Sequence, residues 1–281
     1  MARKSMIGPI TFLVVAFGIP WAGWLFINDE RLNLWLFPGF ASVAGFVASF
    51  AEGGKNGLTV FSRRVFTIRS ALTHVVVAAL IPLLLGLSYL LGTGISLSSI
   101  ALFPSAVLGL SLGAALLTGP MAEEFGWRGY LQPLLLERLA PFWVALVVGF
   151  VWWSWHIALY RNSVFASPIS ALNFLAYLET WSVFMVFLVY RAHGSVWPAV
   201  ALHWAANTHP GILQALLPSV DGSKLPGGSK GSLYYFGVAC VFALINRGFF
   251  FAKQASSGVL DGTANNSFKS KPLRGSALFR R

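Results

Sequence analysis

Apolar residues gather into long blocks along this chain of 281 residues, and short polar stretches separate the blocks. A helix needs about 20 mostly apolar residues to cross the hydrocarbon core of a membrane. Eight blocks come close to this requirement: Ile7–Ile27, Leu34–Phe50, Leu72–Leu91, Ile95–Leu117, Pro141–Tyr160, Ile169–Tyr190, Val196–Leu217 and Leu233–Phe251. The pattern therefore predicts an all-α fold, a polytopic membrane bundle of about eight transmembrane helices.

The polar residues between the blocks support this division. They fall at 28–31, 52–69, 161–163 and 221–230, which we interpret as loops. The first block follows a basic segment, as the core of a signal peptide does. It is too long for such a core, and no small-residue cleavage site follows it. We therefore expect a retained first span.

The composition agrees with a membrane protein and argues against a nucleic-acid partner. Hydrophobic residues make up 56% of the chain and charged residues 10%, with a mean hydropathy of +0.70. A soluble domain carries about 25% charged residues. The net charge is +11, but the basic residues lie between apolar blocks and in the tail, where they would face anionic lipid. The single cysteine, Cys240, excludes an internal disulfide.

The basic residues also predict an orientation. If the N-terminus is cytoplasmic, eight spans place all but four of the 20 Lys and Arg residues on the cytoplasmic side. Such an asymmetry is typical of proteins that obey the positive-inside rule. We expect a multi-pass cell-membrane protein with both termini in the cytoplasm. Residues 1–253 would form the membrane domain, and residues 254–281 a basic, disordered cytoplasmic tail.

Ionisable residues inside three of the helical segments are the strongest functional signal. Inserting one such residue at the centre of a membrane helix costs roughly 2.5–3.5 kcal/mol of free energy, so its presence marks a functional site. In the first segment, Glu124 and Arg128 are four residues apart and can pair on one helix face. Glu123 points about 100° away, which leaves it free to act as a general base. Gly126 and Gly129 would allow a neighbouring helix to approach closely.

The other two segments each repeat the four-residue spacing. Trp152 shares a helix face with His156, and His203 shares one with Asn207. A turn within 137–141 would place Glu123 and His156 at about the same depth in a helical hairpin. We expect structural roles for the remaining buried polar residues and for the tryptophan-rich stretch around 152–155. Those polar residues are His74, Glu179, His193 and His209.

Taken in order, these residues resemble the motifs of the CPBP intramembrane peptidases, also called the Abi or CAAX prenyl protease family. The motifs are Glu-Glu-x-x-x-Arg, Phe-x-x-x-His and His-x-x-x-Asn or Asp, on separate membrane helices. Here they correspond to Glu123-Glu124 with Arg128, then His156, then His203 with Asn207. The resemblance covers about residues 119–207. Trp152 stands where the family usually has phenylalanine.

The resemblance implies an endopeptidase that cleaves a membrane-associated protein or peptide. Glu123 would activate a water, His156 would position that water or transfer protons, and His203 and Asn207 would stabilise the oxyanion. Glu124 and Arg128 would support them. The expected mechanism uses no cofactor. Zinc is the alternative, and it would be held by Glu123, His156 and His203, because two histidines and a carboxylate form a possible zinc site.

Two other functions stay open at this point. The chain could be a non-catalytic membrane protein, such as a bacteriocin self-immunity protein or a peptide-binding scaffold. It could also be a proton-coupled transporter that uses Glu123 or Glu179 as a relay. Transporters often carry paired broken helices in two related halves, and Gly119-Pro120 has no convincing counterpart elsewhere in the sequence.

Overall fold

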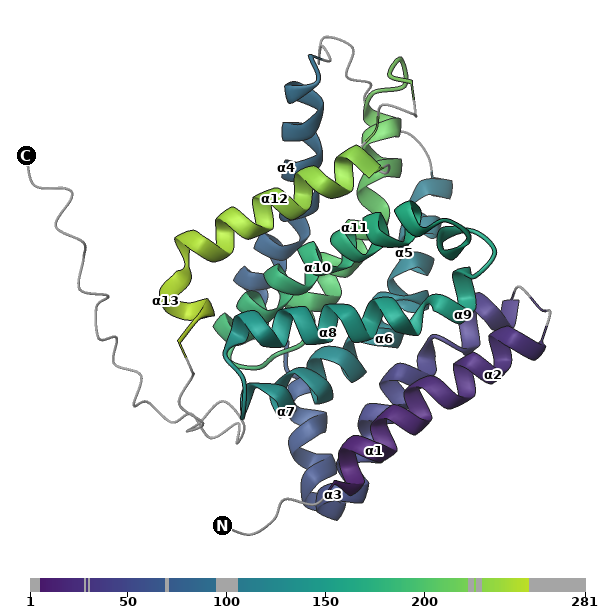
Figure 1. Ribbon diagram of the computed structural model, residues 1–281, viewed down its shortest axis with the longest axis vertical. Coiled ribbons are helices and arrows are strands. Elements are labelled where there is room, and N and C mark those ends of the chain that lie inside the picture. Colours follow the sequence, from purple (N-terminus) through teal and green to yellow (C-terminus); the bar gives the residue numbers. More distant parts are fainter. Residues whose placement is uncertain are drawn as a thin grey trace, which may run out of the picture.

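The computed structural model describes residues 6–27, 29, 31–68, 71–94, 106–221, 225 and 229–252. Helices dominate the described part of the chain, which contains no β-strand. The predicted all-α class is therefore confirmed (Figure 1).

The N-terminal half of the described chain holds two continuous apolar helices and several shorter pieces. The elements are α1 (Ile7–Leu13), η1 (Val14–Gly18), α2 (Ile19–Phe26), η2 (Leu32–Leu36), α3 (Gly39–Phe66), α4 (Leu72–Gly92) and α5 (Ala106–Thr118). The pieces α1, η1 and α2 run on without interruption, with η1 as a π-helical turn. They form one helix that packs along α3.

The C-terminal half contains the three motifs. Its elements are α6 (Pro120–Gly126), η4 (Trp127–Leu131), α7 (Gln132–Leu136), α8 (Pro141–Trp155), α9 (Ile157–Tyr160), η5 (Val164–Ala166), α10 (Pro168–Arg191), α11 (Trp197–Leu216), α12 (Ser229–Ile245) and α13 (Arg247–Phe250). Helix α10 packs against α8, α11 and α12, while α4 lies along α11 and α6 packs against α3. The motif helices α6, α8 and α11 therefore surround one interior region (Figure 1).

Three helical stretches are long and apolar enough to cross a membrane. They are Ile7–Phe26, Leu72–Gly92 and Pro168–Arg191, and each agrees with a predicted span to within a residue or so at either end. Two shorter apolar helices, Pro141–Trp155 and Lys230–Ile245, overlap two further predicted spans. The number of eight spans and their orientation stay predictions. The predicted span Ile95–Leu117 lies partly outside the described residues, and the predicted tail 254–281 lies wholly outside them.

One predicted loop is wrong. The polar stretch 52–69 is helical as far as Phe66, because α3 reverses direction at Gly54 instead of ending there. Gly54 has φ +55° and ψ −142°, a conformation open almost only to glycine. The ring of Phe46 packs against that of Phe61 with centroids 4.7 Å apart, so the two arms of α3 lie side by side.

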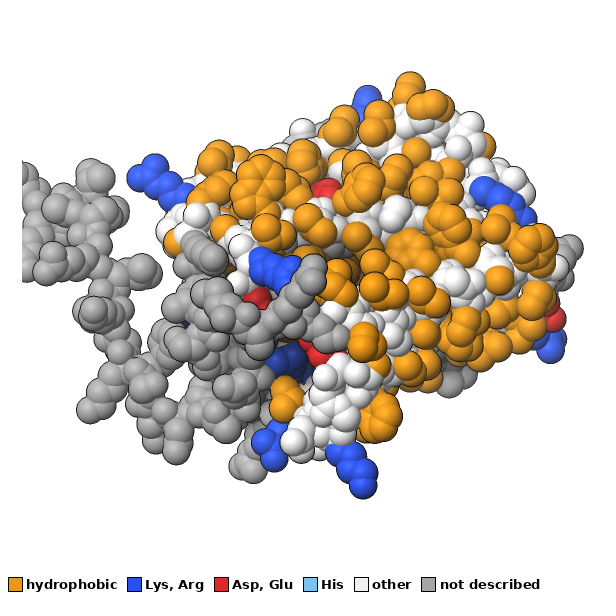
Figure 2. Space-filling view, turned by 60° about the horizontal axis from the view of Figure 1, so that its bottom comes forward, with side chains coloured by type: hydrophobic (Ala, Val, Ile, Leu, Met, Phe, Trp, Pro, Cys, Tyr) orange, Lys and Arg blue, Asp and Glu red, His pale blue; other side chains and the backbone are white. Residues whose placement is uncertain are grey.

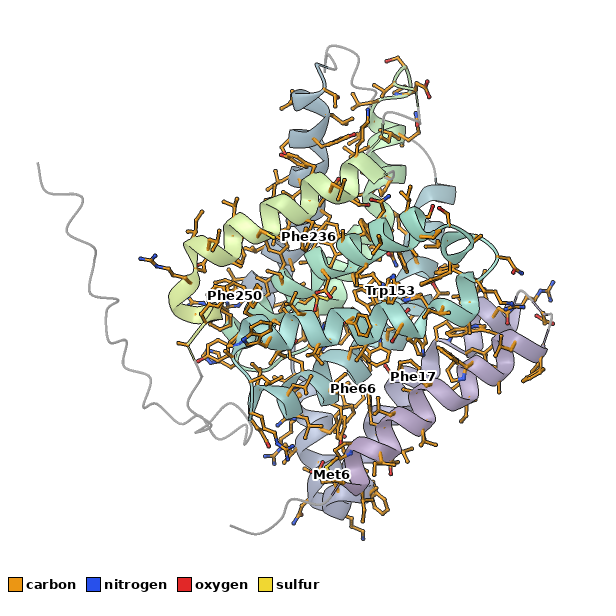
Figure 3. All side chains as sticks on the ribbon, viewed as in Figure 1. Met6, Phe17, Phe66, Trp153, Phe236 and Phe250 are labelled. Atoms are coloured by element: carbon orange, nitrogen blue, oxygen red, sulfur yellow. The ribbon has the colours of Figure 1, made fainter. Side chains whose placement is uncertain are left out.

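Many large apolar side chains point outward from the bundle. Phe26 is 85% exposed and Ile245 is 77% exposed, at opposite ends of the described chain. Apolar side chains cover most of the face shown in Figure 2, and they project outward from the helices in Figure 3. Contiguous apolar surface on this scale is unusual for a soluble monomer and is suited to contact with lipid.

Candidate active site

The first motif lies at the start of α6, directly after a break in the helix. Gly119 precedes α6, and Pro120 begins it, which suits proline because the first helical residue needs no N–H partner. Gly126 has no room for a side chain, since a Cβ there would collide with the backbone of Ala41 in α3. The close helix approach predicted for this glycine is confirmed, and it fixes the depth of the acid pair in the bundle.

Glu124 lies at the centre of a buried ionic group. Its Oε2 lies 3.1 Å from Arg128 Nε, and its Oε1 lies 2.8 Å from His203 Nδ1. Glu124 and Arg128 have no exposed side-chain surface. The predicted pairing of Glu124 with Arg128 is therefore confirmed. The bond to His203 on α11 joins two motifs that the sequence could not connect.

Arg128 makes further contacts with α10. Its Nε also lies 3.3 Å from Met185 Sδ, and its guanidinium reaches Ser182 Oγ at 3.5 Å. The Ser182 hydroxyl donates to the carbonyl of Ala145 in α8 at 2.7 Å. Glu179 adds an electrostatic attraction to Arg128. A buried charge is tolerated only when it is paired and hydrogen-bonded. Glu124 of α6 and the two α10 side chains supply such contacts to Nε and Nη1 of Arg128, while its Nη2 has no hydrogen-bond partner among the described residues.

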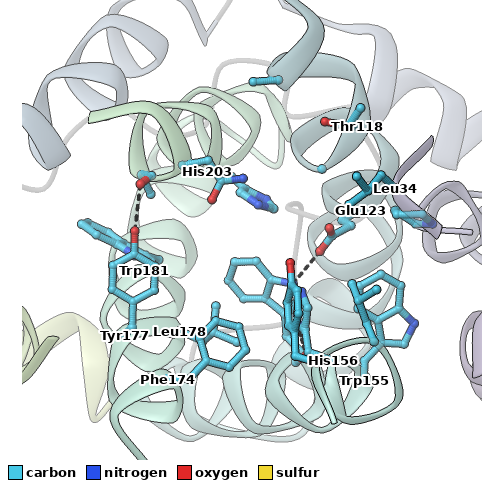
Figure 4. Close-up of a pocket in the computed structure, with 18 of the residues that line it drawn as sticks. Leu34, Thr118, Glu123, Trp155, His156, Phe174, Tyr177, Leu178, Trp181 and His203 are labelled. Carbon is cyan, nitrogen blue, oxygen red and sulfur yellow. Dashed lines mark hydrogen bonds between the residues drawn. The ribbon is translucent and has the colours of Figure 1, made fainter. Parts of the chain in front are cut away.

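Glu123 interacts with α8 through Trp152. The Trp152 indole N–H donates to Glu123 Oε2 at 2.6 Å, drawn as a dashed line in Figure 4. The same indole ring lies 5.4 Å from the Arg128 guanidinium carbon and 5.0 Å from the His203 ring. Trp152 therefore packs in the core, as predicted for this stretch, and in addition bonds the Glu123 carboxylate. Its place four residues before His156 was the available signal, because that spacing puts both side chains on one face.

His156 is held at the C-terminal end of α8. Its Nδ1 lies 2.8 Å from the backbone carbonyl of Trp152. A carbonyl only accepts, so Nδ1 carries the proton and Nε2 of the neutral ring is left as an acceptor. The ring stacks on Tyr160 with centroids 5.5 Å apart. His156 thus ends α8 and breaks the predicted continuous span Pro141–Tyr160.

Polar atoms from two helices converge beside Gly119. A Cβ built on this glycine would lie 3.4 Å from Asn207 Nδ2, 3.4 Å from His203 Nε2 and 3.6 Å from Glu123 Oε1. These three side chains therefore meet around one small space that only a glycine leaves open. From the sequence, Gly119 is expected only to break the helix. Its position directly before the acid motif is the feature of the sequence that points to a role in the site.

The space beside Gly119 opens into a cavity of about 470 Å³. Glu123, His156, His203 and Asn207 all line it, so the four predicted site residues lie around one cavity (Figure 4). Glu124 and Arg128 lie behind them in the packed interior. Most of the other lining residues are apolar or aromatic: Leu34, Trp35, Pro38, Ala114, Ala115, Trp152, Trp155, Leu159, Tyr160, Val164, Phe174, Tyr177, Leu178, Trp181 and Ala206.

The polar residues expected to be structural lie away from this cavity. The two ring nitrogens of His209 contact the Ala206 carbonyl at 2.9 Å and the Tyr235 hydroxyl at 3.0 Å. Glu179 is buried against Gly149, where a Cβ would come 2.5 Å from its carboxylate. His193 is exposed and His74 is half-buried. None of the four lines the cavity.

The described side chains are not gathered as metal ligands in this structure. Within the described ranges, no three His, Cys, Asp or Glu side chains come together as a metal site requires. His203 Nδ1 is held by Glu124, and His156 Nδ1 by the Trp152 carbonyl, which leaves Nε2 of each ring free, as in histidines that bind metals. Zinc held by Glu123, His156 and His203 stays the alternative, and metal dependence stays a prediction.

Comparison with known families agrees with the motifs. Residues 104–209 match the family model described as type II CAAX prenyl endopeptidase Rce1-like. The match confirms the resemblance to the CPBP family, and it includes every predicted site residue. It supports a membrane protease in general. No curated protein matches the chain.

Proposed function

We propose that this chain is an intramembrane endopeptidase that hydrolyses a peptide bond of a membrane-associated protein or peptide. The single observation that supports this most is the convergence beside Gly119, where Glu123, His203 and Asn207 each place a polar atom within 3.6 Å of one point. A carboxylate next to two potential hydrogen-bond donors is the arrangement that water activation and oxyanion stabilisation require.

In the proposed mechanism Glu123 is the general base. Trp152 occupies its Oε2, so Oε1 remains to accept a proton from a water in the cavity. The water oxygen then attacks the scissile carbonyl carbon. When the tetrahedral intermediate collapses, the C–N bond breaks and Glu123 returns the proton to the leaving amine. The products are a carboxylic acid and an amine, and the enzyme is restored.

Asn207 and His203 stabilise the oxyanion of that intermediate. The Asn207 amide donates from Nδ2, and His203 donates from Nε2 when its ring is protonated. Glu124 stabilises that protonated ring through Nδ1, and Arg128 pairs with Glu124. His156 keeps Nε2 as an acceptor and orients the attacking water. The roles proposed for Glu123, His156 and His203 agree with the partners that hold their other polar atoms.

The apolar lining of the cavity suits a membrane-associated substrate. Aromatic and aliphatic side chains from α8, α9 and α10 surround the polar atoms, so the segment next to the scissile bond would lose little by leaving lipid. We expect a peptide of the CAAX protease type, reaching the site from the cytoplasmic side of the cell membrane. No nucleic-acid partner is expected.

The decisive experiment compares Glu123→Gln with wild-type protein in detergent micelles. A quenched fluorogenic peptide with a farnesylated CAAX end serves as the probe, beside the same peptide without the lipid. We expect kcat to fall by at least about 10³-fold, because the base is lost while its shape is kept. Glu52→Gln is the matched control, since Glu52 is exposed and its bond from Tyr130 survives the change.

Equal cleavage by Glu123→Gln and wild type would overturn the assignment. Binding of the peptide without any cleavage by wild-type protein would favour the peptide-binding alternative. Proton uptake into liposomes that disappears in Glu179→Gln would favour the transporter.

A further inference from the structure

One backbone carbonyl in α11 lacks its regular helical partner. Ala206 lies between His203 and Asn207 at the turn that bears both proposed oxyanion donors. In a regular helix its carbonyl would accept a hydrogen bond from the N–H of residue 210. That residue is Pro210, which lies inside α11 and has no N–H. The Ala206 carbonyl must therefore find other donors.

Two side chains supply these donors. The Tyr177 hydroxyl of α10 donates to the Ala206 oxygen at 2.8 Å, and His209 Nδ1 lies 2.9 Å from the same oxygen. Because the carbonyl only accepts, His209 Nδ1 carries the proton. Its Nε2 then accepts from the Tyr235 hydroxyl at 3.0 Å. The carbonyl that Pro210 frees is thus bonded twice.

The two bonds have different consequences. His209 belongs to α11, three residues after Ala206, so its bond satisfies the carbonyl without fixing α11 to another helix. Tyr177 comes from α10 and also lines the cavity (Figure 4). Its bond therefore ties the turn between His203 and Asn207 to the neighbouring helix.

We propose that Tyr177 is a positioning residue, whose hydroxyl fixes the His203–Asn207 turn through the Ala206 carbonyl that Pro210 leaves unpaired. The proposal rests on the proposed function, because it assigns Tyr177 to the same site. Tyr177 acts through α11 and not on the reacting atoms. A 1 Å displacement of such donors is enough to lower a catalytic rate substantially.

The alternative role for Tyr177 is direct contact with the substrate. Variants at Pro210 distinguish this role from the positioning role. Pro210→Ala restores an N–H that competes with the Tyr177 hydroxyl for the Ala206 carbonyl, so the tie to α10 is already weakened in this variant. Pro210→Gly restores the same N–H and serves as a second variant if the first folds poorly. Tyr235→Phe is the matched control, because it deletes a hydroxyl from the same hydrogen-bonded group on the side away from the cavity.

The experiment is a double-mutant cycle on purified protein in detergent. Wild type, Tyr177→Phe, Pro210→Ala and the double variant are compared by kcat and KM on the quenched CAAX peptide, and by melting temperature. We expect Tyr177→Phe to lower kcat about three- to tenfold with KM unchanged, as loss of one hydrogen bond would. In the Pro210→Ala background the same change should cost less than about twofold. Tyr235→Phe should lower the melting temperature and leave kcat unchanged.

Two results would overturn the proposal. One is an equal loss of kcat on Tyr177→Phe in both backgrounds, which would assign the hydroxyl to substrate contact. The other is coupling in melting temperature without coupling in kcat, which would make the bond purely structural. Failure of the proposed function would give a different result, namely full activity of Glu123→Gln. That result would not change the coupling between Tyr177 and Pro210 in melting temperature.

Discussion

Two turns of α11 carry a buried histidine each, yet they differ in what their polar atoms face. His203 is 4% exposed and His209 is 0% exposed, so burial does not separate them. Both nitrogens of His209 are bonded, to Ala206 and Tyr235. His203 is held through Nδ1 by Glu124, while its Nε2 lies beside the open point next to Gly119.

The difference shows what makes a buried polar residue available for chemistry. A residue whose hydrogen-bonding capacity is used up by the fold contributes to structure alone. A residue that is fixed on one side and faces a cavity on the other can act on a ligand. The first turn should therefore respond to mutation in activity, and the second in stability.

Among variants that test this comparison, Asn207→Ala should have the largest effect. Removing an oxyanion donor typically costs about 10²–10³ in kcat. Asn207 is exposed toward the cavity, so the free energy of unfolding should change by less than about 0.5 kcal/mol. Steady-state cleavage and thermal unfolding in detergent measure the two. The control is Thr208→Ala, whose hydroxyl bonds within its own helix. A normal kcat in Asn207→Ala would remove it from the site.

His209→Leu should show the opposite pattern. It leaves the Tyr235 hydroxyl without its acceptor in the interior and removes one of two donors to Ala206. Buried groups left unpaired cost about 1–3 kcal/mol each, so the melting temperature should fall clearly. Because Tyr177 still holds the Ala206 carbonyl, kcat per folded molecule should stay within about threefold. A large loss of kcat with normal stability would contradict the comparison.

Gly119→Ala should lower kcat less than Asn207→Ala does, and it tests the open point directly. The glycine has φ −122°, which alanine can adopt, and the added methyl would make ordinary contacts at 3.4 to 3.6 Å. The fold should therefore survive, while the methyl takes the space of the attacking water. We expect kcat to fall about tenfold. Gly113→Ala is the control, since a Cβ there meets nothing within 4 Å. Unchanged activity would place the water elsewhere.

Much of the fold could be predicted because hydrophobicity acts locally. The blocks beginning at Ile7 and Leu72 correspond closely to observed helices, and the predicted turn at 137–141 separates α7 from α8. The reversal at Gly54 could not be foreseen, because the polar residues after it suit a loop and an amphipathic arm equally. A single glycine in an unusual backbone conformation decides between them.

The site was predictable within helices and not between them. Four-residue spacing correctly paired Glu124 with Arg128, because both lie in one helical stretch. The bonds from Glu124 to His203 and from Trp152 to Glu123 cross between helices, and spacing along the chain carries no information about such contacts. Gly119 was undervalued for a similar reason, since its importance depends on side chains that arrive from α11.

The close contact between Gly126 and Ala41 means that the segment with the proposed catalytic residues depends on the rest of the bundle. Residues 104–209 contain all the proposed chemistry, yet the helix bearing the acid pair rests directly on the main chain of α3. The Ser42 hydroxyl donates to the Met121 carbonyl, and the Trp155 indole donates to Ala16. A fragment that contains only residues 104–209 would lack α3, the helix whose contact with Gly126 fixes the position of Glu123 in the bundle. Chimaeras should therefore exchange α1 to α3 together with the motif helices.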